Sequence, residues 1–507
     1  MTITSTKRLA KNTILLYIRT FFVMLVGLYA SRVVLEVLGV SDYGIYNVVG
    51  GVIVMFSVIS ASLSNSITRY ITFELGRGDK KKLSDVFSTS INVQIALSAI
   101  IILLVEILGV WFLYTKLNIP ESRITAAFWV LQCSLLTFVI QLISLPYNAT
   151  LIAHERMNVF AYIGLLEAIL KLLCVFAIAI TPFDRLISYA IFLSISALII
   201  RAIYGLYCKK HFEECTYHLI LDKKLLKEMF GFAGWNFLGT GAYIFNTQGV
   251  NILSNMFFGV AVNAARGIAG QAESGVRQFI YNFTTALNPQ IIKSYADKDY
   301  ESCFSIVRKG GKYSFFLMFF FFIPFVLEAE TLLGIWLKEV PEHAVIFWQL
   351  AMLGTLVDLP GAPITILAQA TGKIKTFYIY IGSLGCLVFP ASYVLFKIGF
   401  PPEASYWTYV VVYAYLVYVR LVLMNKQIGF PIKPFFMEVA IPVTCVLVLS
   451  TIPPAIVRYT MQPGYVRFIL VAITSVISIT GSVLYVGMET NERKEVVGFI
   501  INKIRRR

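Results

Sequence analysis

The chain has 507 residues, of which 58% are hydrophobic and only 14% are charged. Soluble domains contain about 45–50% apolar and about 25% charged residues, because their surfaces face water. The composition therefore excludes a soluble enzyme, a disordered chain and a secreted disulfide scaffold, and it predicts an all-α integral membrane protein. In a soluble protein the net charge of +15 would suggest nucleic acid, so the location of the basic residues matters.

Apolar stretches of about 18–25 residues, separated by short polar turns, predict transmembrane helices. Fourteen stretches fit this description: 12–38, 45–70, 86–113, 124–146, 159–180, 185–207, 230–256, 263–286, 312–328, 344–369, 376–397, 406–424, 439–457 and 465–487. No signal-peptide cleavage site follows Lys7, Arg8 and Lys11, so we expect the first stretch to be a helix that is not removed.

The basic residues are distributed unequally between the two sides of these helices. Of the 43 Lys and Arg residues, 28 fall on the side that carries both termini, six on the opposite side and nine within the stretches. Cytoplasmic loops carry the excess of Lys and Arg in membrane proteins. We therefore expect a multi-pass protein with both termini in the cytoplasm, membrane lipids at its surface and no nucleic-acid partner.

Two segments of the chain resemble each other at a nearly constant offset. Pro146, Ala153 and Arg156 match Pro363, Ala370 and Lys373 217 positions later, and Leu38-Gly39-Val40 matches Phe258-Gly259-Val260 at offset 220. This predicts two six-helix lobes of parallel orientation with a substrate path between them. We expect an N-terminal lobe at 1–208, a cytoplasmic linker at 209–229, a C-terminal lobe at 230–425, and two extra helices with a basic tail at 426–507.

Polar side chains form stripes on four of the predicted helices. In the eighth helix Arg266, Glu273 and Arg277 fall within about 40° of one another at 100° per residue. Further polar positions lie on the first, second and seventh helices: Arg19, Asn47, Asn65, Asn236, Tyr243 and Thr247. Charged groups inside a membrane are costly and usually face a wet cavity. We predict a central cationic cavity that binds substrate, whereas the alternative is that the polar residues serve helix–helix packing.

A second group of charged residues suggests ion coupling. Glu106 and Asp358 are isolated acids in the third and tenth helices, and Glu167 and Lys171 lie one turn apart in the fifth. An isolated buried carboxyl could carry a proton or bind a cation, while the Glu167–Lys171 pair could equally be structural.

No sequence motif indicates catalysis, a cofactor or a metal. The chain has no glycine-rich phosphate loop, no G-x-S-x-G and no H-E-x-x-H. Cys208, His211, Cys215 and His218 share a helical face, but a continuous helix would spread them over about 15 Å and could not close around one Zn²⁺. We expect a transporter with no metal and no cofactor.

The turn Leu38-Gly39-Val40-Ser41-Asp42-Tyr43-Gly44-Ile45-Tyr46, together with the Pro…Ala-x-x-Arg/Lys endings of the fourth and tenth helices, resembles the multidrug/oligosaccharidyl-lipid/polysaccharide (MOP) exporter superfamily. The resemblance covers essentially the whole chain. It implies an O-antigen or capsule flippase that moves an undecaprenyl-pyrophosphate-linked oligosaccharide across a bacterial inner membrane by alternating access. It also implies a role in polysaccharide or lipopolysaccharide biosynthesis, with a polysaccharide polymerase as a partner.

The fourteen predicted helices are similar to those of the lipid II flippase branch, in which the last two helices form a groove for the lipid tail. In this sequence Pro442, Pro453 and Pro454 are expected to interrupt the thirteenth helix and its end. Two alternatives remain open: a MATE-type drug/cation antiporter, which would favour an acidic cavity, and a membrane polysaccharide polymerase.

Overall fold

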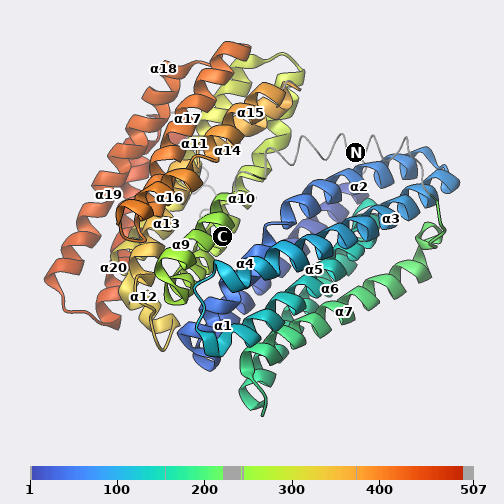
Figure 1. Ribbon diagram of the computed structural model, residues 1–507. Helices are drawn as coiled ribbons and strands as arrows, with labels where there is room; N and C mark the ends of the chain where they lie inside the picture. The colour runs from blue at the N-terminus through green and yellow to red at the C-terminus, as the bar shows by residue number, and fades with distance from the viewer. Residues whose placement is uncertain are drawn as a thin grey trace. The chain divides into compact units, whose positions relative to one another are not determined.

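The computed structural model describes residues 3–154, 156–220, 241, 245–372, 374–490 and 492–494; side chains are described from Phe21 onward, except at scattered helical positions. Every regular element in this part of the chain is a helix (Figure 1), which confirms the all-α prediction. Eleven helical segments are long and apolar enough to cross a membrane. Many of their large apolar side chains are exposed, which suits helices that face lipid.

The first half of the chain forms seven long or medium helices. They are α1 (Ile3–Val54), α2 (Ser57–Arg77), α3 (Lys80–Leu104), α4 (Val110–Thr115), α5 (Ile124–Ala153), α6 (Met157–Ile180) and α7 (Arg185–His211). A π-helical turn at Val105–Gly109 joins α3 to α4. α5 packs along α7 and α2, and α1 packs along α6 and α5. A core of buried aliphatic residues from α1, α3, α5 and α7 holds this half together.

The second half of the described chain, from Val250 onward, is also helical. Its elements are α9 (Val250–Phe258), α10 (Val260–Ala296), α11 (Tyr300–Leu327), α12 (Ala329–Trp336), α13 (Ala344–Asp358), α14 (Gly361–Ala370), α15 (Ile374–Gly385), α16 (Val388–Ile398), α17 (Ala404–Ile428), α18 (Ile432–Phe435), α19 (Ile441–Thr460) and α20 (Tyr465–Ser482). α13 packs on α17, and the hairpin of α19 and α20 packs on α11.

Three predicted helices are missing from the eleven apolar segments, each for its own reason. The 45–70 stretch is divided by a break at Met55 and Phe56 between α1 and α2. Most of 230–256 lies outside the described residues. The 263–286 stretch is helical as part of α10, but its polar side chains lower its hydropathy below that of a lipid-facing helix.

The expected interruption of the thirteenth helix is wrong. Pro442 lies just after the π-helical turn Phe436–Ala440, and the helical segment continues through it from Ile432. Pro453 and Pro454 lie inside the same helix, which continues to Thr460. The hairpin of α19 and α20 therefore consists of two continuous helices.

The described glycines support the predicted repeat. Gly39, at the kink of α1, has φ 77° and ψ 171°, and Gly259, between α9 and α10, has φ 81° and ψ −172°. This conformation is essentially restricted to glycine. The two paired alanines, Ala153 and Ala370, are likewise the last residues of α5 and α14. The offsets found in the sequence thus join positions with the same local structure.

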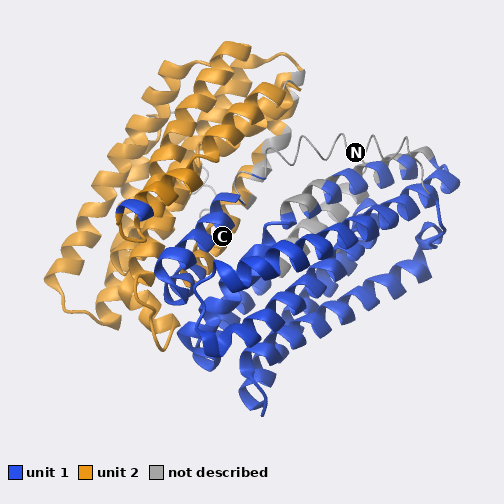
Figure 2. Ribbon diagram, viewed as in Figure 1, with its two compact units in different colours: residues 1–267, 396–398 blue, residues 268–395, 399–507 orange. Residues whose placement is uncertain are grey.

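The chain divides into two compact units, drawn in separate colours in Figure 2. Unit 1 comprises Met1–Gly267 and Phe396–Ile398, and unit 2 comprises Ile268–Leu395 and Gly399–Arg507. The division falls inside α10 and not in the predicted linker 209–229. One reason lies in α9, where Asn255 accepts a hydrogen bond from the Asn118 backbone amide (2.8 Å), so that α9 is fastened to the helices before it.

Candidate functional site

The polar face of α10 carries a connected set of hydrogen bonds in unit 2. The Glu273 carboxylate accepts hydrogen bonds from Arg277 Nε at 2.5 Å and from the Thr355 hydroxyl of α13. Arg277 also donates to Thr355 Oγ1 at 3.0 Å. Thr355 is 2% exposed, whereas 32% of the Arg277 side chain remains exposed. Arg277 is therefore fixed in direction but still accessible.

The same group continues across α13 to α17. Asp358 Oδ2 lies 4.0 Å from Arg277 Nη1, and Asp358 Oδ1 accepts a hydrogen bond from Arg420 Nη1 at 2.8 Å. Glu273, Arg277, Asp358 and Arg420, which we name the charge network, thus alternate in sign. Only 9% of the Arg420 side chain is exposed. In a low-dielectric interior each charge depends on its neighbours, because an uncompensated buried charge is costly.

A glycine makes room for this arrangement. A Cβ atom added at Gly361, at the start of α14, would lie 1.5 Å from Arg420 Nη1. The guanidinium therefore rests directly on the α14 backbone, where no other side chain fits without moving it. The break between α13 and α14 at Leu359 and Pro360 brings this glycine next to Asp358.

The structure corrects the expectation for Asp358. Asp358 is not an isolated acid, since it forms an ion pair with Arg420 and lies near Arg277. Likewise the second member of that pair, Arg420, is buried against Asp358. The sequence could not reveal the pair because its members are 62 positions apart.

Asn47 serves helix packing, in agreement with the alternative reading of the polar stripes. Its side-chain amide donates to the Tyr43 carbonyl of its own helix at 2.8 Å, and a Cβ on Gly267 would lie 2.7 Å from it. Asn251 donates to the Asn47 carbonyl at 3.3 Å.

An asparagine cluster that the sequence reading did not single out lies beside it in unit 1. Asn263 donates to Asn251 Oδ1 at 2.8 Å and accepts from Asn255 Nδ2 at 2.9 Å. Asn255 and Asn263 are fully buried. The spacing of Asn251 and Asn255, one helical turn apart just before Gly259, is the signal that could have indicated this cluster.

The remaining predicted binding residues are distributed as follows. The side chains of Arg19 and Asn65, and the residues Asn236 and Tyr243, lie outside the described part of the chain. Thr247 belongs to a π-helical turn and is half-buried. Arg266 is half-buried on α10, 11 positions before Arg277, which corresponds to about 16 Å along the helix. That these positions surround one central cavity stays a prediction.

The other candidates for ion coupling differ from Asp358. Glu106 lies in the π-helical turn after α3, with its side chain at the chain surface among the exposed Leu103, Ile107 and Leu108. Glu167 and Lys171 lie one turn apart on α6, and no ion pair between them occurs among the described side chains. Within the described residues, no group of three or more His, Cys, Asp or Glu side chains could hold a metal.

Ion pairs fasten the hairpin of α19 and α20 to the rest of unit 2. Glu328, fully buried before α12, pairs with Arg467 of α20 at 2.7 Å. Near the other end of α11, Arg308 pairs with Glu438 at 2.7 Å. One ion pair thus lies just after the C-terminal end of α11 and the other lies toward its N-terminal end.

No protein-family model matches the sequence, and no curated protein sequence matches it. Among solved structures, the lipid II flippase MurJ in an inward closed conformation gives a TM-score of 0.70 at 13% identity, covering 92% of this chain and 98% of that one. An inward-facing multidrug resistance MATE family transporter of the MOP superfamily gives 0.61 at 12% identity, covering 81% and 94%. The MATE multidrug transporter DinF-BH gives 0.57 at 17% identity, covering 84% and 96%.

At these identities the likeness concerns the fold. It extends over nearly the full length of each transporter and over most of this chain. The helices, the paired glycine kinks and the solved structures agree with the resemblance seen in the sequence: this chain has the multi-pass helical fold of the MOP-superfamily transporters.

Proposed function

We propose that this protein is a flippase that moves an undecaprenyl-pyrophosphate-linked oligosaccharide, an O-antigen or capsule repeat unit, across a bacterial inner membrane by alternating access. The supporting observation is the extent of the likeness to the lipid II flippase MurJ. The likeness covers 92% of the 507 residues. Because only 440 residues precede Ile441, some of the matched residues must belong to the hairpin of α19 and α20. The MATE likenesses, at 81% and 84%, do not require that hairpin.

The charge network supports an anionic cargo. A pyrophosphate must leave water to cross the membrane, and an arginine can offset part of that cost through two charge-assisted hydrogen bonds. Arg277 is the most exposed member of the network, and its contact to Asp358 is long at 4.0 Å. A bound pyrophosphate would take the place of a carboxylate as partner of Arg277.

This exchange also offers a way to link binding to movement. Without cargo, Glu273 and Asp358 compensate Arg277, and α10 is held to α13. When cargo is bound, its phosphate competes for Arg277 and weakens the contacts between α10 and α13. Asp358 then keeps Arg420 as its partner. A ligand shifts a conformational equilibrium only through such a difference in contacts between two states.

The experiment that tests the function is deletion of the gene in its host, followed by analysis of lipid-linked intermediates. We expect undecaprenyl-linked oligosaccharide to accumulate on the cytoplasmic face. An unchanged pool of lipid carriers on both faces would refute the flippase.

Variants of the arginines test the site itself. Arg277→Gln and Arg266→Glu should abolish export while the protein still inserts in the membrane, and Lys209→Glu, an exposed site on the side assigned to the cytoplasm, serves as control. Full export by both arginine variants would refute the cationic role.

A drug/cation antiporter is the second candidate, favoured by the two carboxylates of the charge network. Glu273 and Asp358 could bind a cation if Arg277 and Arg420 moved away. Deletion would then change drug tolerance and leave the lipid carriers unaltered.

A further inference from the structure

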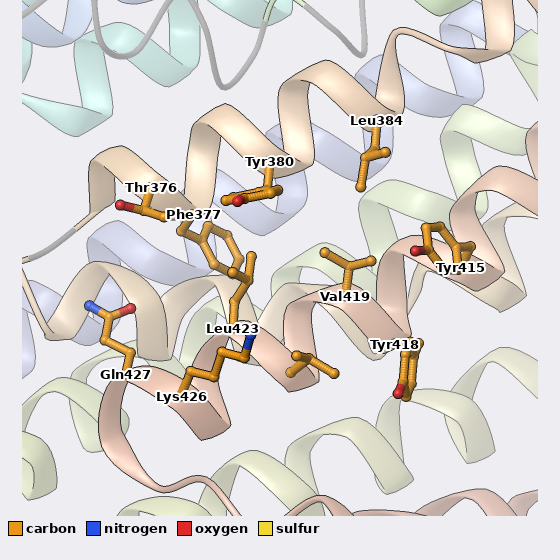
Figure 3. Close-up of a pocket in the computed structure, with 11 residues that line it drawn as sticks. Thr376, Phe377, Tyr380, Leu384, Tyr415, Tyr418, Val419, Leu423, Lys426 and Gln427 are labelled. Carbon is orange, nitrogen blue, oxygen red and sulfur yellow. The ribbon is translucent and has the colours of Figure 1, made fainter.

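A groove runs between α15 and α17 in unit 2, remote in sequence from α10. Its volume is about 620 Å³, in the range of about 300–1,000 Å³ that is typical of ligand sites. Figure 3 shows Tyr380 and Leu384 of α15 on one wall and Tyr418, Val419 and Leu423 of α17 on the other. Apolar and aromatic side chains line most of it, and Phe377, which is buried, forms part of its floor.

The groove is open at the surface of the two helices. Both belong to segments apolar enough to span a membrane. Tyr380, Tyr415 and Tyr418 are 52%, 56% and 50% exposed, so the aromatic lining is open at the surface of unit 2. From Tyr415 to Gln427 the α17 wall is about 18 Å long, close to the depth of one leaflet of a hydrocarbon core of about 30 Å.

One end of the groove is cationic. Lys426, near the end of α17, is exposed, and Figure 3 shows its side chain extending along α17 toward Leu423. Among the described side chains no carboxylate pairs with Lys426, and hydrogen-bonding groups of Thr376 and Gln427 lie at the same end. The distribution of basic residues assigns this end to the cytoplasmic leaflet, which carries the anionic lipids.

We propose that this groove binds an anionic phospholipid of the cytoplasmic leaflet. One acyl chain lies against Phe377, Leu384 and Val419, and the headgroup phosphate binds Lys426. The groove has a cation near one end and an apolar wall about as long as one leaflet is deep, which is the charge and shape pattern of such a lipid. The site does not depend on the cargo proposed above, since none of the residues that line the groove belongs to the charge network.

The test is native mass spectrometry of the delipidated full-length protein, titrated with phosphatidylglycerol or with phosphatidylethanolamine of the same acyl chains. We expect phosphatidylglycerol to bind more tightly. Lys426→Gln should weaken that binding about fivefold, the share of one basic residue near an anionic surface. Leu384→Trp, which fills the groove, should abolish it, with thermal unfolding measured to verify the fold.

Lys433→Gln is the matched control, because Lys433 is an exposed lysine of α18 that does not line the groove. It should bind phosphatidylglycerol as the unaltered chain does. Equal affinity for the two phospholipids overturns the proposal. Unchanged binding of phosphatidylglycerol by both Lys426→Gln and a correctly folded Leu384→Trp variant overturns it too. Binding of undecaprenyl phosphate at this site in preference to phosphatidylglycerol overturns it as well.

Discussion

At Asp358, one carboxylate connects three helices. It accepts a hydrogen bond from Arg420 of α17, lies 4.0 Å from Arg277 of α10, and ends α13 itself. The side chains involved are mostly shielded from water, so the energy of each depends on the presence of the others. The stability of this part of unit 2 should therefore depend more on whether the charges of the network stay paired than on how many hydrogen bonds its side chains make.

We predict that Asp358→Asn destabilises the protein by roughly 3–5 kcal/mol, because it leaves the Arg420 charge without its partner. The double variant Asp358→Asn/Arg420→Met should recover most of that loss, since it removes both charges. Thermal unfolding of the single and double variants in the same detergent measures the effect. A double variant less stable than Asp358→Asn would contradict the balance of charges as the cause.

The sequence indicated part of this site. The 3.6-residue period placed Glu273 and Arg277 on one face of a helix, and the structure has them paired across one turn. It could not pair Asp358 with Arg420, since helix periodicity says nothing about residues in different helices. Nor could it show that Gly361 is needed for the approach of Arg420.

Among the elements, the kinks at Gly39 and Gly259 shape the two halves. Both residues have φ near +80° and extended ψ, which turns the chain between two helices without a loop. An L-residue in this region costs about 1–3 kcal/mol.

Gly39→Ala and Gly259→Ala should each lower the stability by that amount. Gly50→Ala is the control, because Gly50 lies in the regular part of α1 with open space around it. It should be neutral or slightly stabilising, since alanine favours helix over glycine. Equal thermal stability of all three variants would show that an L-residue is accommodated at Gly39 and Gly259 without strain.

The segment that follows α20 is attached by ion pairs. Burial by itself would raise the pKa of Glu492, but hydrogen bonds from Lys312, the Glu489 amide and Lys309 outweigh it and lower the pKa to about 2. A lowered folded-state pKa stabilises the folded state above the ordinary value of 4.5, and that contribution is lost as the pH falls toward 2.

We predict that hydrogen exchange of residues 488–494 increases as the pH falls from about 4.5 to 2, after correction for the intrinsic rate. In Glu492→Gln the segment should exchange faster at neutral pH and lose this additional dependence. Glu489→Gln, at an exposed position, should behave as the unaltered chain. A Glu492→Gln variant with the original pH profile would exclude Glu492 as the titrating group.

For the whole molecule, the distribution of basic residues predicts the orientation in the membrane. Single cysteines would be placed in a chain whose seven native cysteines are replaced by alanine. In intact cells, a membrane-impermeant maleimide should label Lys116→Cys and Lys338→Cys. It should label Lys80→Cys and Lys209→Cys only after permeabilisation. All four positions are exposed. The reverse pattern would place the termini outside.

The sequence by itself determined the membrane class, the helical fold and the superfamily resemblance, because these depend on local composition, on periodicity and on short motifs. Tertiary structure alone decided which charges are partners, that the division between units falls inside α10, and that α19 continues through its prolines. These depend on packing between distant segments: Asp358 and Arg420 are 62 positions apart, and Glu328 and Arg467 are 139 apart. Inside a membrane such pairs matter most, since a buried charge there must find its partner within the protein.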